Sequence, residues 1–268
     1  MRADLALKRH RDLPVTVCTL VLAWQVFPDA PVVAAANRDE RVDRPSEPPA
    51  RRDWARAPIA PVDAEAGGTW IGYNEVGVFT AITNRWTGGN LAGERSRGLL
   101  VRDVLGEGSA EAGARLVERA VDDHEYDGFN LVIADESAAV YLEWDGGLSV
   151  RNFEPGVHVA VNVGADGRYA IGGPRADRAR AQSQNADGVR TALQPEPGEE
   201  SRAWLDRAAA VIADHDYGVC VHGDGYGTRS SSLIRVGPEL REYEFAPGPP
   251  CETAFESVES DGLREGHL

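Results

Sequence analysis

The strongest apolar pattern in the chain lies near its start, where two hydrophobic runs flank a short polar turn. The first run is VTVCTLVLAW, residues 15–24, and the second is PVVAAA, residues 31–36. Runs of this length, rich in β-branched residues and separated by a Pro-Asp pair, are typical of a β-hairpin. A basic start followed by an apolar segment and AAA is also the pattern of a secretion signal. Gln25, Pro28 and Asp29 interrupt the apolar region, so we favour the hairpin.

Further along the chain, the period of the apolar positions separates strands from helices. Segments of strand length predict strands at residues 69–73, 78–84, 129–135, 139–145, 148–153, 157–163, 230–236 and 240–245. Helical spacing predicts two amphipathic helices within residues 96–122 with a break near residues 106–108, an exposed helix that begins at Pro174, and a helix over residues 202–215. The proline- and arginine-rich residues 37–61 show no period and predict a long surface loop.

The order of these elements indicates the class of fold. Groups of strands alternate with groups of helices, which suits antiparallel sheets covered by segregated helices rather than the βα units of a Rossmann fold. No repeat of fixed period is present, so we predict a single α+β domain over residues 18–247. Residues 1–17 are interpreted as an N-terminal extension, and residues 248–268 as an acidic, mobile tail.

The charge of the chain argues against two classes of partner. The 268 residues include 43 acidic and 28 basic ones, which gives a formal net charge of −15, and Lys8 is the one lysine. A surface this acidic repels phosphate backbones and anionic lipids, so we expect neither nucleic-acid binding nor membrane binding. No apolar run reaches the ~18 residues of a membrane-spanning helix. The acidic, lysine-poor composition resembles that of proteins adapted to high salt.

Cysteine and histidine usage argues against a metal site. The cysteines are Cys18, Cys220 and Cys251, an odd number with wide separations and no C-x-x-C pair. We therefore expect no disulfide framework and no structural zinc site, and we expect a reducing, cytoplasmic setting. His222 and Asp224 are two candidate ligands, but no third lies near them in the sequence, so we predict no metal.

The predicted hairpin places Cys18 beside charged residues. Cys18 begins the first strand, and Asn37 to Glu40 end the second, so antiparallel pairing brings the two ends together. Strand alternation puts Asn37 and Asp39 on one face and the other two residues on the opposite face. The guanidinium of Arg38 near the thiol would favour the thiolate, which a cysteine nucleophile requires. Alternatively, Cys18 packs as a small core residue and the charged residues form surface ion pairs.

Other polar or glycine-rich segments each leave two interpretations open. Gly67-Gly68 permits a tight turn or a close backbone approach to a ligand. Asn84, at the end of a strand, either polarises a carbonyl in an oxyanion hole or caps a turn. Asn130 and Asn162 lie in apolar strands, where a buried amide belongs to a polar network or to a site. Residues 225–231, GYGTRSS, form an anion-binding loop or a turn into a strand.

Taken together and in order, these segments resemble one protein family. The blocks are CTLVLAW, AANRDE with RPSEPP, GGTWIG, TAITN, GFNL and GYGTRSSS, which run from Cys18 to about residue 233. This set is similar to the NRDE family, the family of the transport and Golgi organisation protein 2. The resemblance implies a four-layer αββα sandwich of two antiparallel sheets flanked by helices, the fold of the N-terminal nucleophile (Ntn) hydrolases. That fold agrees with the element order above.

The resemblance also implies a nucleophile and a base. In cysteine members of the Ntn class, the first residue of the mature chain attacks the substrate, and its own α-amino group, with a pKa near ~8, is the base. Carried over, Cys18 is the nucleophile, and Arg38 and Asp39 place its thiolate and its amine. Cysteine acylases of the class usually separate their arginine and aspartate, so the adjacent pair here leaves the roles of Asp39 and Glu40 open.

The remaining implied roles concern the substrate. Asn84 and Asn162 would serve the oxyanion, and Arg229 would anchor the substrate or the catalytic residues. If Cys18 must carry a free amino group, residues 1–17 are a propeptide removed by self-cleavage, or they precede a true start at Val17 written by a GTG codon. We favour the start at Val17.

Two functions of different class follow from this resemblance. The first is an amidohydrolase that needs no cofactor and cleaves a small-molecule amide through an acyl-enzyme on Cys18. The second is a carrier of an acyl ligand or of haem on the same scaffold, without turnover. Members of the family are linked to secretory and Golgi organisation, mitochondrial lipid metabolism and haem trafficking. A scaffold for protein contacts is a third hypothesis, which no exposed apolar stripe in the sequence supports.

Overall fold

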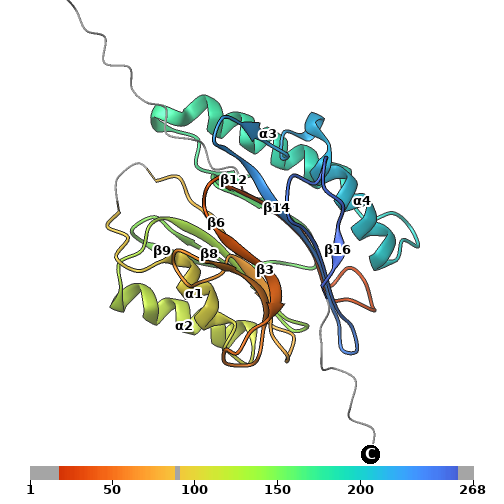
Figure 1. Cartoon of the computed structure of the whole chain (residues 1–268), viewed down its shortest axis with the longest axis horizontal. Coiled ribbons are helices and arrows are strands. Elements are labelled where there is room, and N and C mark those ends of the chain that lie inside the picture. The colour runs from red at the N-terminus through yellow and green to blue at the C-terminus, as the bar shows by residue number, and fades with distance from the viewer. Residues whose placement is uncertain (1–17, 88–90, 259–268) are drawn as a thin grey trace, which may run out of the picture.

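A computed structural model of the chain describes residues 18–87 and 91–258, so the expected extension at residues 1–17 lies outside the described part. Two antiparallel sheets pack face to face, and helices cover both outer faces (Figure 1). Helices α1 (Arg97–Val104) and α2 (Ala110–Asp123) cover one sheet, and helices α3 (Ala176–Ala192) and α4 (Ser201–Ala213) cover the other. The α+β class and the four-layer αββα order are therefore confirmed.

The first sheet has the predicted hairpin at its centre. Its strand order is β12-β11-β10-β1-β2-β14-β15-β16, with β13 paired to β14. Thr19 pairs with Asn37 and Trp24 with Val32, which confirms the hairpin. The strands are β1 (Thr19–Trp24), β2 (Val32–Arg41), β10 (Gly156–Val161), β11 (Gly164–Ala165), β12 (Arg168–Tyr169), β13 (His222–Gly223), β14 (Tyr226–Val236), β15 (Arg241–Ala246) and β16 (Glu256–Ser257).

The second sheet is a meander in which each strand pairs with the next one along the chain. It contains β3 (Ser46–Arg51), β4 (Ile59–Asp63), β5 (Ile71–Tyr73), β6 (Phe79–Asn84), β7 (Phe129–Ala134), β8 (Ala139–Trp144) and β9 (Leu148–Asn152). Helices α1 and α2 lie between β6 and β7 in the sequence. In the described part of the chain, α1 is thus the next helix or strand after the one that ends at Asn84.

Strand β1 is buried at every position and apolar from Leu20 onward because it faces two cores at once. Leu20, Leu22 and Trp24 belong to the core between the two sheets. Val21 and Ala23 point the other way and pack under α3 and α4. A central strand buried on both faces reads as a continuous apolar run, and this explains its resemblance to a signal segment.

The helices follow their sequence signals with one difference. Ser96 and Ser109 cap α1 and α2, accepting hydrogen bonds from the backbone N–H groups of Gly98 and Ala112. The predicted apolar stripe of α4 is buried, with Trp204 fully enclosed. Helix α3 begins after a short 3₁₀ turn at Gly173–Arg175, but it is longer and less exposed than expected. Its inner face buries small residues, and its arginines occupy the outer face.

Residues 37–61 are not the long loop that the sequence predicted. They contain the end of β2, all of β3 and the start of β4. Pro48 and Pro49 hide this from sequence reasoning because proline cannot donate to a sheet ladder. The structure tolerates them because β3 is an edge strand with an irregular register between Glu47 and Ala50.

The expected mobile tail is also partly incorrect. Residues 248–258 return to the edge of the first sheet, where Phe245 of β15 pairs with Glu256 of β16 and the Val258 N–H donates to the Tyr243 carbonyl. Residues 259–268 lie outside the described part of the chain. In the residues that the structure does describe, none of the helices combines the length and the hydropathy that crossing a bilayer requires.

Candidate active site

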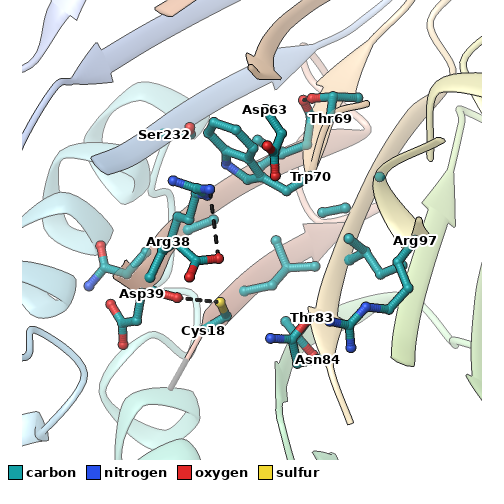
Figure 2. Close-up of a pocket in the computed structure, with 18 of the residues that line it drawn as sticks. Cys18, Arg38, Asp39, Asp63, Thr69, Trp70, Thr83, Asn84, Arg97 and Ser232 are labelled. Carbon is teal, nitrogen blue, oxygen red and sulfur yellow. Dashed lines mark hydrogen bonds and ion pairs between the residues drawn. The ribbon is translucent and has the colours of Figure 1, made fainter. Parts of the chain in front are cut away.

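A cavity of about 120 Å³ opens between the two sheets at the start of β1. Figure 2 shows the Cys18 thiol facing into it, with Arg38 beside it and Asn84 and Arg97 across from it. The lining includes Cys18, Arg38, Asp39, Trp70, Asn84 and Arg97. The hairpin, the second sheet and the N-terminus of α1 thus converge on one thiol.

Cys18 directly precedes β1 and is half-buried. Its side chain lies on the same strand face as Leu20 and Leu22, so it points between the sheets. The thiol donates a hydrogen bond to the Asp39 carbonyl at 3.6 Å from the sulfur. Burial, followed by the negative charge of Asp39, raises the pKa of the thiol to about 12, and Arg38 opposes that shift. With its backbone continued on the N-terminal side, Cys18 therefore carries a neutral thiol.

Arg38 and Glu40 face the cavity. The guanidinium of Arg38 lies 4.1 Å above the ring of Trp70 and 3.8 Å from a carboxylate oxygen of Glu40. Burial lowers the pKa of Arg38, and its Nη1 is buried without a hydrogen-bond partner among the described residues. Glu40 also lies 3.8 Å from Arg44, whose Nη2 is 2.7 Å from Asp63. A buried cation with an unused donor on the cavity wall is suited to holding an anionic or carbonyl oxygen.

Asp39 points to the opposite face of β2, as strand alternation predicts. Its Oδ1 accepts a hydrogen bond of 2.6 Å from the Thr228 hydroxyl on β14. Its Oδ2 is buried with no hydrogen-bond partner in the described residues. Burial raises the pKa of this carboxyl to about 8, although the Thr228 hydrogen bond acts to lower it. One oxygen of Asp39 is thus available for a cation that would satisfy it.

Asn37 shares that face but has a supporting role. Its amide nitrogen donates to the carbonyls of Ile212 and Val219 at 2.8 and 2.9 Å, and its oxygen accepts from the Ser231 hydroxyl at 2.6 Å. These bonds tie β2 to the end of α4 and to the segment that follows it. The asparagine of the NRDE block therefore joins the sheet to its helical layer.

The two asparagines expected to serve the oxyanion occupy different places. Asn84 lines the cavity on the side across from Cys18 (Figure 2). Asn162 is fully buried behind it: its Nδ2 donates to the Asn84 carbonyl at 2.7 Å, and its Oδ1 accepts from Gln182 at 2.9 Å. Asn162 follows β10, in which Val161 pairs with Thr19. The geometry suits Asn84 for contact with a ligand and Asn162 for positioning Asn84.

Asn130 belongs to the polar network that its buried position allowed. Its Nδ2 donates to the Val161 carbonyl at 2.8 Å and to the Thr83 hydroxyl, and its Oδ1 accepts from Tyr141 and Arg85. Because Val161 lies in the first sheet and Asn130 in the second, this amide links the two sheets. Its role is structural, next to the cavity.

Arg229 does not line the cavity. It lies in β14 at the irregular register between Thr228 and Ser230, and its role stays a prediction. The glycines before it form a turn, since Gly223 pairs with Tyr226 and Gly225 has a φ of 73°.

Sequence reasoning missed Arg97, a cation that does line the cavity. Arg97 opens α1, donates to the Gly128 carbonyl at 2.7 Å and has a pKa lowered by burial. The first turn of α1 contains no acidic residue. A basic residue there is electrostatically unfavourable, because helix N-termini favour anions, and this was the available signal. Gly68 supports the position: a Cβ on it would lie 2.1 Å from the Gly98 carbonyl carbon, so the close approach of Gly67-Gly68 is to α1.

Comparisons with known proteins identify the family to which this sequence is similar. The sequence profile of the family described as Transport and Golgi organisation 2 matches residues 17–245. A human Transport and Golgi organization protein 2 homolog is 27% identical over 234 residues, which cover 76% of this chain and 82% of that protein. A mouse homolog is 33% identical over 113 residues, and this alignment spans 40% of each chain.

Solved structures show the same fold at low identity. Penicillin V acylase from Agrobacterium tumefaciens is 14% identical with a TM-score of 0.53, over 86% of this chain and 83% of the acylase. A Caenorhabditis elegans ortholog of N-acylethanolamine-hydrolyzing acid amidase is 12% identical with a TM-score of 0.53, over 81% of this chain and 92% of the amidase. These structures share the Ntn-hydrolase-like sandwich, and the profile match covers most of the sequence. The chain belongs to the Transport and Golgi organisation 2 family.

Proposed function

We propose that this protein is a cysteine-type N-terminal nucleophile hydrolase that cleaves carbon–nitrogen bonds in small-molecule amides. The observation that carries the proposal is the placement of the Cys18 thiol at an inter-sheet cavity bordered by Arg38, Asp39 and Asn84. The names of the two similar structures, an acylase and an N-acylethanolamine-hydrolyzing amidase, support an amide as the substrate class.

The proposed reaction has two steps, acylation of Cys18 and hydrolysis of the resulting thioester. The Cys18 thiolate attacks the amide carbonyl carbon, the carbon–nitrogen bond breaks, and the nitrogen leaves as an amine after accepting a proton. Water then attacks the resulting thioester, releases the carboxylic acid and returns the thiol. Asn84, whose side chain lines the cavity, would donate to the oxyanion of each tetrahedral intermediate.

The base in this proposal is the α-amino group of Cys18, which exists only when Cys18 is the first residue. A free ammonium at that position would supply the cation that the unpaired Oδ2 of Asp39 lacks. It would also add a positive charge beside the thiol and lower a pKa that is about 12 without it. A free α-amino group at Cys18 would thus both pair with the unsatisfied Asp39 carboxylate and favour the thiolate of Cys18.

The test uses the protein purified from native cells. Intact mass should correspond to a chain that begins at Cys18, and an electrophilic amide or thiol probe should label Cys18 rapidly. Cys18→Ser should abolish the labelling, whereas Ser149→Ala, at an exposed position of β9, should leave it unchanged. A native chain that keeps residues before Cys18 and an inert Cys18 thiol would rule the hydrolase out.

A second candidate is a carrier of an acyl ligand or of haem without turnover. The raised pKa of Cys18 favours the carrier, since a neutral buried thiol is a poor nucleophile but can line a binding site. Titration of the purified protein with haem, followed by optical absorbance, and with a fluorescent fatty acyl probe, tests this directly. Stoichiometric binding that Cys18→Ala weakens, together with no probe hydrolysis, would favour the carrier.

A further inference from the structure

Four soft or nitrogen-containing side chains converge at the surface, away from the Cys18 cavity. They are His215 in the 3₁₀ turn His215–Tyr217, Cys220 after it, His222 in β13, and Cys251 beyond β15. One ligand atom from each lies within 4.8 Å of the other three. The Cys220 and Cys251 sulfurs are 3.5 Å apart, and His222 Nε2 lies 3.1 Å from the Cys251 sulfur and 3.8 Å from the Cys220 sulfur.

The three separations among Cys220, His222 and Cys251 lie close to those of a tetrahedral centre. Zinc–sulfur bonds of about 2.3 Å and zinc–nitrogen bonds of about 2.0–2.1 Å place neighbouring ligand atoms about 3.3–3.8 Å apart. Two thiolates and two imidazoles are also the donor set that structural zinc sites use, whereas calcium and magnesium prefer oxygen. A disulfide would need the two sulfurs about 2.05 Å apart, well inside the separation in this structure.

We propose that His215, Cys220, His222 and Cys251 bind one zinc ion as a closed, four-coordinate structural site. Binding converts both thiols to thiolates and releases two protons to solvent, so the centre with neutral imidazoles carries no net charge. Nε2 of His222 faces the sulfurs, and its Nδ1 lies 4.0 Å from a carboxylate oxygen of Glu252. A carboxylate on the far nitrogen is the partner that orients a metal-binding histidine.

The pairing of the strands explains why this site could not be predicted from the sequence. Only His215, Cys220 and His222 are close in sequence, and Asp224, the partner considered for His222, is not in the group. Cys251 arrives from a segment 29 positions beyond His222 because β15 pairs with β14, and β14 pairs with β13. The fourth ligand is a product of tertiary structure.

The proposed zinc site also adjoins residues that support the Cys18 cavity. The zinc proposal itself does not depend on hydrolysis. Cys220 lies between Val219, whose carbonyl accepts from Asn37, and Val221, whose N–H donates to the Thr228 hydroxyl at 2.9 Å. Thr228 in turn donates to Asp39. A metal held by Cys220 would therefore fix the segment that positions Asn37 and Asp39.

Metal content decides the proposal. The full chain is purified with reductant, without chelator and without a polyhistidine tag, and zinc is measured per chain by mass spectrometry of the elements. Wild type should hold about one zinc, and replacement by cobalt should give the visible bands of a tetrahedral ion with thiolate charge transfer. Cys251→Ser and His222→Ala, both at exposed side chains, should lose the zinc on dialysis and lose those bands.

Two control variants make the result specific. His124→Ala removes an exposed histidine on the opposite helical layer, and Cys18→Ser removes the third cysteine, so both should keep about one zinc. Circular dichroism of each variant checks that the chain is folded. A folded wild type that is free of metal after this purification and takes up no zinc when it is added would overturn the proposal. Cobalt bands that persist in Cys251→Ser would do the same.

Discussion

Asp39 offers a direct test of the site, because the raised pKa of its carboxyl must make the free energy of unfolding depend on pH. Burial moves the pKa of its carboxyl from 3.8 to about 8. Between these values the folded chain keeps a proton that the unfolded chain releases, so stability must fall as pH rises. The slope is about 1.36 kcal/mol per pH unit, and over the whole window the loss is on the order of 5 kcal/mol.

The perturbation is Asp39→Asn, which preserves shape and cannot ionise. Urea unfolding of wild type and variant at a series of pH values from 5 to 8 measures the two free energies of unfolding. We expect the difference between variant and wild type to shift in favour of the variant by about 4 kcal/mol across that range. Asp43→Asn, at an exposed position nearby, controls for the loss of one negative charge. Two parallel curves for Asp39→Asn and wild type would refute the burial argument.

The same measurement bears on the identity of the chain's first residue. In a chain that begins at Cys18, the new ammonium would favour the ionised carboxylate and lower the pKa of Asp39. The fall in stability between pH 5 and 8 should then shrink or vanish, whereas a chain with residues before Cys18 should retain it. An equal slope in both forms would mean that the amine does not reach Asp39.

Three further variants test the surroundings of the cavity. Thr228→Val removes the 2.6 Å hydrogen bond to Asp39 and should raise the pKa of Asp39, so the fall in stability should continue above pH 8 when the urea series is extended to pH 10; a profile equal to that of wild type over this wider range contradicts this. Gly68→Ala should cost about 1–3 kcal/mol in urea unfolding because its Cβ would meet the Gly98 carbonyl carbon, whereas Gly147→Ala, with open space around it, should be nearly neutral. Asn162→Ala should slow probe labelling of Cys18 about tenfold by freeing the Asn84 carbonyl; an unchanged rate would make Asn162 purely structural.

The parts of the fold that the sequence predicted are those in which local pattern and tertiary environment agree. The hairpin could be predicted because β1 is apolar from Leu20 to Trp24 and Pro28-Asp29 marks its turn. The buried apolar stripe of α4 could be predicted because Trp204 and the other buried residues recur at helical spacing. Strand β3 could not, since Pro48 and Pro49 argue against a strand and are acceptable only at a sheet edge. Whether a strand lies at the edge or in the centre of a sheet is decided only when the whole sheet is assembled.

The candidate site divides in the same way. Cys18, Arg38, Asp39 and Asn84 could be placed together because hairpin pairing and motif order bring them to one end of the sheets. Arg97 could not, since its segment reads as an ordinary amphipathic helix and its approach to the thiol depends on how Gly68 packs against Gly98. Cys251 could not either, because its segment has the composition of a mobile tail and returns to the sheet only through β16.

The geometry also distinguishes the surroundings of the two acids of the NRDE block. Glu40 shares the cavity face with Arg38 and lies 3.8 Å from both Arg38 and Arg44, so cations already surround its charge. Asp39 is on the other face with one oxygen unpaired, and its carbonyl receives the Cys18 thiol. A one-residue slip of β2 against β1 would exchange these environments, burying Glu40 against Thr228 and Asp39 against Trp70. Strand alternation therefore sends the adjacent Arg38 and Asp39 side chains to opposite faces of the sheet, although they are neighbours in sequence.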